Sequence, residues 1–454
     1  MTTHVHRTTR PAGARTATSP EGRPVARVVL SSLAIGVAAA IVLTMVALPG
    51  AAEGVTTGST LLAFGLGWGL LRVRSARTTK PQRWATVPAA AMTSIGLALM
   101  VVAPSDRDLT ALTWVWPPLM LVLAGWTYLR MRRSLTGGGR WLATVVLALL
   151  AATSVSAGLG NLSSSRVAST YPAPGVTRST GDHDLHIDCH GQGQPTVVLF
   201  NGLGEFSASW AQVVDGVAPA TRVCAYDRAG QGWSDDVDDP QDGVAAADDL
   251  HALLAAAGER GPFVLVGHSI GGPYAMTYAD RHPDDVTGLV LLDSTSPRQF
   301  DAIPSYPLQY ALMRRAYGVL PSLARLGLGP LLAGSHLPAD DAAPVDAMAA
   351  TPRAARIARD ELSMLPTVFR QAQALTTLEG RPLVVLTSAE NARDTAGWAK
   401  AQERMAELSA DTLHREVAAS HAGMVEDPDG ATASVQAIAS VVRAVRTGRP
   451  LTTR

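Results

Sequence analysis

Residues 263–272 read FVLVGHSIGG. The first four are apolar and predict a short buried strand, the next five form a Gly-x-Ser-x-Gly motif, and a helix is expected to begin near Pro273. A nucleophilic serine needs such a sharp turn, because a helix N-terminus and the backbone N–H of the following residue then stabilise developing negative charge. Ser269 is therefore the candidate nucleophile, although a glycine-rich turn without chemistry can carry the same motif.

Apolar segments of strand length alternate with helical patterns on both sides of this stretch. The further predicted strands are residues 183–189, 195–200, 221–226, 286–293, 381–387 and 412–417. Such alternation predicts an α/β fold with a mostly parallel sheet covered by helices on both faces.

Four motifs stand in one order along this part of the chain. They are Asn201-Gly202-Leu203-Gly204, Asp227-Arg228-Ala229-Gly230-Gln231-Gly232, Gly267-His268-Ser269-Ile270-Gly271-Gly272 and the late pair Ser420-His421. With these motifs, residues 181–447 resemble an α/β-hydrolase-fold serine hydrolase of the esterase or lipase kind. The resemblance does not cover the first 165 residues.

The resemblance implies a base and an oxyanion hole for Ser269. A hydroxyl is a weak nucleophile and needs an imidazole to take its proton, and the family places that histidine after its last strand, here at His421. The backbone N–H groups of Leu203 and Ile270 would hold the oxyanion. The alternative for His421 is a surface-loop histidine.

The third member of the triad is less direct. The place that the family usually gives to the acid falls at Asn391 in this sequence. Some relatives, notably certain haloalkane dehalogenases, take the acid instead from the end of the preceding strand, which falls at Asp293. We favour Asp293 and keep Glu390 as the alternative acid; Asp293 could also merely cap a turn.

The chain has only two cysteines, Cys189 and Cys224. In the fold that the resemblance implies they would lie on neighbouring strands, so we predict a disulfide, with two buried thiols as the alternative. Other ligands at metal-binding spacing are lacking beside them. Neither a metal nor an organic cofactor is implied.

Residues 295–380 form a long insertion between two core strands. Helical patterns at 306–325 and 354–376, broken by prolines such as Pro321, resemble the helical cap that covers the pocket in many relatives. A cap of this kind suits a small, hydrophobic acyl substrate.

The first third of the chain differs in composition from the rest. Uncharged apolar runs at residues 28–52, 54–71, 84–105, 109–129 and 141–165 each have about the length that crosses a bilayer. We predict a disordered cytoplasmic tail at 1–27, a membrane module of about five transmembrane helices at 28–162, and a linker at 163–180. The second run, which is short and rich in glycine, is the weakest of the five.

Charge predicts the orientation of this module. Residues 1–162 hold 15 Lys and Arg against four acidic residues, although the whole chain has 38 of each sign. The basic residues gather before the first run, between the second and third, and between the fourth and fifth. The positive-inside rule therefore predicts a multi-pass cell-membrane protein with a cytoplasmic N-terminus and an extracytoplasmic hydrolase domain. Strict alternation with apolar runs argues against nucleic-acid binding.

These observations predict a membrane-anchored extracytoplasmic hydrolase that cleaves an ester or related acyl bond through an acyl-enzyme on Ser269. An acyltransferase or a carbon–carbon bond hydrolase would use the same residues. A non-enzymatic membrane protein whose hydrolase-like domain binds a ligand or partner is the alternative of another class. A transporter is disfavoured, because the apolar runs contain no Asp, Glu, Lys, Arg or His.

Overall fold

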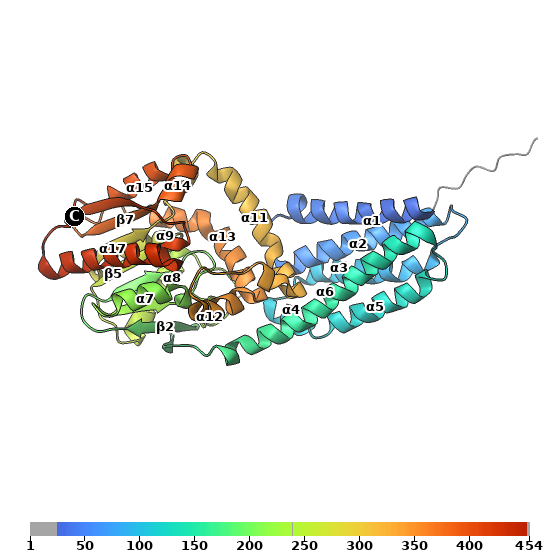
Figure 1. The fold of residues 1–454 in the computed structure, drawn as a ribbon, viewed down its shortest axis with the longest axis horizontal. Coiled ribbons are helices and arrows are strands. Elements are labelled where there is room, and N and C mark those ends of the chain that lie inside the picture. The colour runs from blue at the N-terminus through green and yellow to red at the C-terminus, as the bar shows by residue number, and fades with distance from the viewer. Residues whose placement is uncertain (1–24, 238, 452–454) are drawn as a thin grey trace, which may run out of the picture.

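The structure is a computed structural model that describes residues 25–237 and 239–451. A bundle of helices and an α/β domain lie end to end along the long axis (Figure 1). Most of the predicted tail, residues 1–24, lies outside the described residues, and Val25 already begins helix α1.

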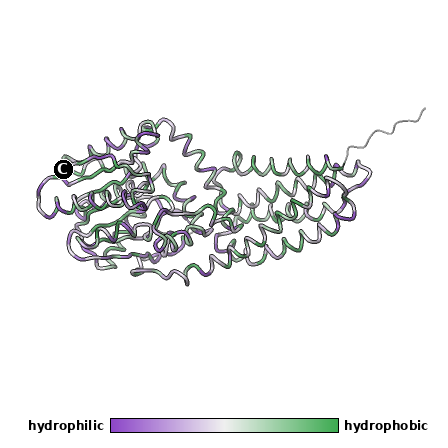
Figure 2. The backbone as a smooth tube through the Cα atoms, in the orientation of Figure 1, coloured by the Kyte–Doolittle hydropathy of each residue, from purple (hydrophilic) through white to green (hydrophobic). Residues whose placement is uncertain are grey.

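The bundle contains the predicted apolar runs. Its helices are α1 (Val25–Val42) with the π-helical η1 (Leu43–Ala47), α2 (Glu53–Ser75), η2 (Arg83–Ala85), α3 (Thr86–Val102), α4 (Asp106–Leu112), α5 (Trp116–Met131) and α6 (Gly137–Thr170). Four are long and apolar enough to cross a membrane, and α4 and α5, bent by 47°, make a fifth if they form one span. Hydrophobic residues dominate these helices, and hydrophilic residues gather at the end farthest from the sheet (Figure 2).

Helix α2, whose glycines made it the weakest predicted span, lies at the centre of the bundle packing. A Cβ atom on Gly65 would lie 2.3 Å from the Thr93 hydroxyl of α3, and one on Gly67 would lie 3.2 Å from the Gly36 Cα of α1. The glycines therefore let three helix backbones approach closely, as small residues do between membrane helices.

The predicted linker at 163–180 is shorter than expected. Helix α6 runs on to Thr170, and strand β1 occupies Val176–Ser179, so only residues 171–175 connect the two parts. Serine and threonine are tolerated in the last turns of a helix, and the first proline of this segment is Pro172, which follows the helix end.

The α/β domain is built on one eight-stranded sheet. Its strands are β1 (Val176–Ser179), β2 (Asp184–His190), β3 (Val197–Phe200), β4 (Val223–Tyr226), β5 (Phe263–His268), β6 (Val286–Leu292), β7 (Leu383–Ser388) and β8 (Thr412–Val417). Their order is β1-β2-β4-β3-β5-β6-β7-β8, and only the β1–β2 and β2–β4 pairs are antiparallel. The carboxyl ends of the six parallel strands thus share one edge, where ligands bind in such sheets.

Helices cover both faces of the sheet, as predicted. The helices are η3 (Ser207–Trp210), α7 (Ala211–Val217), α8 (Gly243–Ala256), α9 (Gly271–Arg281), η4 (Pro283–Asp285), α14 (Ala389–Asp394), α15 (Trp398–Ala406), α16 (Gly423–Glu426) and α17 (Pro428–Thr447). Alternate residues of one strand enter different cores: Val198 and Phe200 pack toward α8 and α9, whereas Val197 and Leu199 pack toward α7 and α17. The period-2 pattern of a buried strand accounts for this division.

The long insertion forms a helical cap. Its elements are α10 (Gln299–Ala302), α11 (Tyr306–Leu323), η5 (Ala324–Leu328), η6 (Gly329–Leu331), α12 (Ala339–Ala349) and α13 (Pro352–Ala372). Helix α11 continues through Pro321, where a break was expected. The backbone leaves helical geometry only at Gly327, whose φ is 79°. A glycine adopts this left-handed conformation without the cost that a side chain would add.

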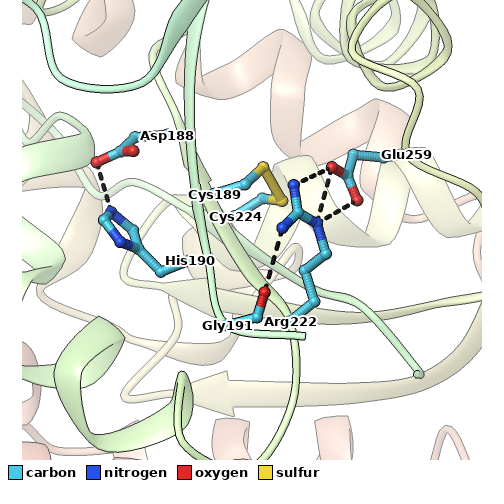
Figure 3. Close-up of a disulfide and its surroundings, with 7 residues drawn as sticks. All are labelled: Asp188, Cys189, His190, Gly191, Arg222, Cys224 and Glu259. Carbon is cyan, nitrogen blue, oxygen red and sulfur yellow. Dashed lines mark hydrogen bonds and ion pairs between the residues drawn. A yellow bond between two sulfur atoms is a disulfide. The ribbon is translucent and has the colours of Figure 1, made fainter. Parts of the chain in front are cut away.

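A disulfide joins Cys189 of β2 to Cys224 of β4 (Figure 3). The two residues face each other in the antiparallel register, with their Cα atoms 4.0 Å apart. Arg222, beside them, donates to Glu259 at 2.6 Å (Figure 3). The bond ties the antiparallel edge of the sheet to the first of its parallel strands.

Replacing both Cys189 and Cys224 by alanine is expected to lower the free energy of unfolding by about 4 kcal/mol, because the disulfide joins residues with a sequence separation of 35. Thermal unfolding of the full-length variant, beside wild type under non-reducing conditions, measures the difference. Equal stability of the two proteins, with the disulfide present in wild type by mass spectrometry, would contradict the expectation.

Candidate active site

Ser269 stands on a sharp turn between strand β5 and helix α9. Its φ is 54°, a left-handed conformation that costs energy for a residue with a side chain. The turn closes tightly because Gly271 has no side chain: a Cβ atom there would lie 2.1 Å from the Phe200 carbonyl oxygen of the neighbouring strand. The geometry presents the serine hydroxyl at the carboxyl edge of the sheet.

Three residues that are far apart in the sequence meet at this edge. The His421 Nε2 atom lies 2.9 Å from the Ser269 hydroxyl, and its Nδ1 atom lies 2.6 Å from a carboxylate oxygen of Asp293. They follow strands β5, β6 and β8, three parallel strands of one sheet. The arrangement is a hydroxyl, an imidazole and a carboxylate connected by two hydrogen bonds, the order that a serine nucleophile, a base and an acid would need.

Asp293 is fully buried and its carboxylate is fully hydrogen-bonded. One oxygen accepts from the Ser388 backbone N–H at 3.0 Å and the Trp398 indole at 2.7 Å, and the other accepts from His421 and the Asn391 amide. Burial raises the pKa of the Asp293 carboxyl, but the hydrogen bond from His421 and its charge outweigh this, so that its pKa lies below the ordinary value.

The structure distinguishes the two candidate acids by position. Asp293 contacts His421, whereas Glu390 is exposed on helix α14. Asn391, at the place where the family usually has the acid, donates its amide to Asp293 at 2.6 Å. An amide therefore supports the carboxylate from the position that another carboxylate would otherwise fill.

Of the two predicted oxyanion donors, Ile270 follows Ser269 directly, and Leu203 lies on the turn after β3, the strand that pairs with β5. Among the described residues, neither the Leu203 nor the Ile270 backbone N–H has a hydrogen-bond acceptor. The N–H groups on either side of Leu203 do: Gly202 donates to Glu205 at 2.5 Å and Gly204 to Glu361 at 3.5 Å. The turn is thus held by its neighbours while the Leu203 and Ile270 donors stay available for a ligand oxygen.

A buried ion pair connects this turn to the cap. The Arg228 guanidinium donates to the Asn201 and Gly202 carbonyls, at 2.9 and 3.3 Å, and to Glu361 of cap helix α13 at 2.7 Å. Sequence reasoning did not find Glu361, because 133 residues separate it from Arg228. Charges buried in this way are costly unless paired and hydrogen-bonded, so this pair holds the cap on the oxyanion turn.

A second pair that the sequence did not indicate lies under the triad. The His268 Nδ1 atom lies 2.7 Å from the Glu205 carboxylate, and its Nε2 atom lies 3.0 Å from the His421 carbonyl oxygen. Because the His421 carbonyl oxygen can only accept, the Nε2 atom of His268 carries the proton of that hydrogen bond. Burial lowers the pKa of His268, but Glu205 outweighs burial and raises it above its ordinary value.

Glu205→Gln is expected to lower kcat by about tenfold, about 1.4 kcal/mol of barrier, with little change in KM. The carboxylate holds His268, and thereby the His421 backbone, and it also holds Gly202 of the oxyanion turn. Steady-state kinetics on a soluble ester measure the effect, with the exposed Glu403→Gln as matched control. A variant with unchanged kcat would show that this pair does not position His421.

A serine turn after a central parallel strand, with a histidine and an aspartate at the same edge, defines an α/β hydrolase. The model of the alpha/beta hydrolase family matches residues 197–435, more than half of the chain, and the chain belongs to that family. This confirms the fold class predicted from the sequence.

Two curated relatives match shorter segments. An uncharacterized protein of Schizosaccharomyces pombe is 45% identical over 80 residues, 18% of this chain and 15% of the relative. A protein of Azorhizobium caulinodans with carbamate hydrolysis as its proposed activity is 34% identical over 113 residues, 25% of this chain and 42% of the relative. The chain thus spans less than half the length of each.

Among solved structures, the crystal structure of a proposed ancestral haloalkane dehalogenase superimposes with a TM-score of 0.50. The two share 20% identity over 60% of this chain and 99% of that chain. This likeness describes the fold of the α/β domain.

Proposed function

We propose that the protein is a membrane-anchored serine hydrolase that cleaves an ester or related acyl bond, with Ser269 as nucleophile, His421 as base and Asp293 as acid. The contact of the Ser269 hydroxyl with His421, at 2.9 Å, carries the proposal. It is the geometry that lets an imidazole take the proton of an attacking hydroxyl.

In the first half of the reaction, Ser269 attacks the substrate carbonyl carbon while its proton passes to the His421 Nε2 atom. The carbonyl oxygen becomes an oxyanion and accepts from the Leu203 and Ile270 N–H groups. The bond to the leaving alcohol then breaks, and the alcohol takes the proton from His421. An acyl-enzyme remains on Ser269.

In the second half, water attacks the acyl group and gives its proton to His421. The bond to Ser269 breaks, the serine oxygen regains that proton and the carboxylic acid leaves. Throughout, Asp293 accepts a hydrogen bond from the Nδ1–H group of His421, keeps the Nε2 atom free to act as base and stabilises the imidazolium.

The residue at the turn favours an acyl substrate over an alkyl halide or an epoxide. Dehalogenases and epoxide hydrolases of this fold use an aspartate at the turn, and this chain has Ser269 there. A serine hydroxyl attacks a carbonyl carbon, and the two backbone donors described above would stabilise the oxyanion that forms. The substrate class is therefore esters and related acyl compounds.

The domain organisation is part of the proposal. Residues 28–162 would anchor the chain as a multi-pass membrane module, and residues 181–447 with the cap at 295–380 would form the hydrolase domain. The loops between α2 and α3 and between α5 and α6 carry the basic clusters, at the bundle end opposite the sheet (Figure 1). The positive-inside rule then supports an extracytoplasmic hydrolase domain.

Competition between two acceptors tests the acyl-enzyme. Full-length protein in detergent is assayed separately with p-nitrophenyl, phenyl and ethyl butyrate. Methanol is added to each assay, so that water and methanol compete for the acyl group. One common acyl-enzyme predicts the same ratio of butyric acid to methyl butyrate from all three esters. A ratio that depends on the leaving group, or no turnover of any ester, would overturn the proposal.

The orientation has its own test. Glu403→Cys places a thiol on exposed helix α15, and a membrane-impermeant maleimide applied to intact cells is expected to label it. Labelling only after lysis would place the hydrolase domain on the cytoplasmic side and contradict the proposal.

A further inference from the structure

The cap is fixed to the membrane module by a buried ionic cluster. Arg325 of η5 donates to Glu53 at 2.6 Å and to Asp106 at 2.7 Å, the first residues of bundle helices α2 and α4. A third contact, with Thr110 at 3.1 Å, completes the cluster. Breaking such a pair leaves a buried charge unmatched, so the cap stays on the bundle.

The contacts of η5 show where it lies along the bundle helices. Arg325 also contacts the Thr113 hydroxyl at 3.3 Å, and the next residue, Trp114, is 54% exposed, as interfacial tryptophans are. On the other side, the Gly327 Cα lies 2.8 Å from the place of a Cβ atom on Gly160, within the last apolar run of the bundle. The segment therefore lies at the rim of the bundle, where the apolar helices end.

Four large hydrophobic side chains are exposed on the cap, two on helix α11 and two at the end of η6, which follows η5 directly. We name them the interfacial leucines: Leu308 (66% exposed), Leu312 (56%), Leu331 (81%) and Leu332 (53%). In the described part of the α/β domain, the one other exposed large hydrophobic residue is Val176. Exposed apolar side chains that are confined to the cap in this way indicate a contact surface.

Helix α11 is apolar on its opposite face as well. Its inward residues Tyr306, Tyr310, Met313 and Tyr317 belong to or pack against the core cluster that contains Ile270, the neighbour of the nucleophile. The helix runs from the sheet to the bundle end (Figure 1). Apolar contacts therefore continue from the rim, through α11, to the turn that carries Ser269.

From this continuity we propose that the interfacial leucines lie in the outer leaflet of the bilayer and that Ser269 acts on an ester of a membrane lipid taken from that leaflet. The occupant of the surface is the lipid bilayer, because the surface adjoins the apolar ends of the bundle helices. The substrate part of the proposal rests on the serine hydrolase function proposed above.

A comparison of two substrates tests the proposal. Full-length protein in phosphatidylcholine vesicles that contain a long-chain diacylglycerol is compared with the variant Leu308→Ser, Leu312→Ser, Leu331→Ser and Leu332→Ser. Hydrolysis of the vesicle lipid is expected to fall about tenfold, because the variant withdraws apolar surface from the leaflet. Hydrolysis of soluble p-nitrophenyl butyrate is expected to stay unchanged.

The variant with methionine at the same four positions is the matched control and is expected to keep lipid hydrolysis, since methionine is also apolar. Equal loss on both substrates, or no loss on the lipid, would overturn the proposal.

A spectroscopic measurement tests the surface without activity. An environment-sensitive fluorophore on Leu331→Cys in the same vesicles is expected to shift to the blue and to be quenched by lipids that carry a spin label in the acyl chain. The same label on Glu403→Cys is expected to show neither change. A label on Leu331→Cys that stays in water would overturn the leaflet contact. If the label is immersed but the protein hydrolyses no ester, the leaflet contact stands, and the lipid substrate and the serine hydrolase function are both overturned.

Discussion

Ser269→Ala is expected to lower ester hydrolysis by about 10⁴-fold or more, because the substitution removes the hydroxyl that lies 2.9 Å from the His421 Nε2 atom. The fold should tolerate the change, since alanine is smaller than serine and the surrounding turn imposes the φ of 54° on either residue. Turnover of p-nitrophenyl butyrate by full-length protein in detergent measures the loss, and thermal unfolding checks that the variant is folded.

Ser440→Ala is the matched control for this variant. Ser440 lies on helix α17, and its hydroxyl contacts only the Gln436 carbonyl of the same helix in the described residues. Full activity is expected there. A Ser269→Ala protein that retains more than a few per cent of wild-type turnover would show that another group attacks the substrate.

Asp293→Asn is expected to lower kcat by about 10³- to 10⁴-fold, because the neutral amide neither fixes the His421 tautomer nor stabilises the imidazolium. The carboxylate is fully buried, and no described residue other than Asp293 offers a carboxylate to the Nδ1 atom of His421. Solvent therefore cannot replace the lost charge. The same ester assay measures the loss.

Glu390→Gln separates the two candidate acids. Glu390 is exposed, and its substitution is expected to leave kcat unchanged. If Glu390→Gln were the more damaging of the two substitutions, the acid of the triad would be misassigned, and the contact between Asp293 and His421 would be structural.

Local sequence patterns sufficed for the elements that carry the site. Residues 263–272 predict a strand, a turn and a helix, and β5, the Ser269 turn and α9 follow in that order. The same holds for the helices of the cap and for the apolar spans, because helical periodicity and the length of an apolar run are properties of consecutive residues. The facing pair Cys189 and Cys224 followed from strand neighbours that the family resemblance implied.

Contacts between distant residues could not be predicted in this way. Glu205 meets His268 across 63 residues, and Arg325 meets Glu53 across 272. Each of these side chains is an ordinary surface type in the sequence, and only the folded chain brings the opposite charges together. The end of α6 was missed for another reason: serine-rich composition indicates a loop, yet nothing in residues 163–170 forces a helix to stop.

Labelling of the full-length protein with a fluorophosphonate probe, followed by peptide mass spectrometry, tests the activated serine most directly. A serine hydroxyl is a weak nucleophile, so rapid attack on the phosphorus of the probe indicates that an adjacent base activates it. We expect one adduct, on Ser269, that is lost in His421→Ala while that variant remains folded. A folded wild-type protein that stays unlabelled, or an adduct on another residue, would contradict the assignment of Ser269 as the nucleophile of a serine hydrolase.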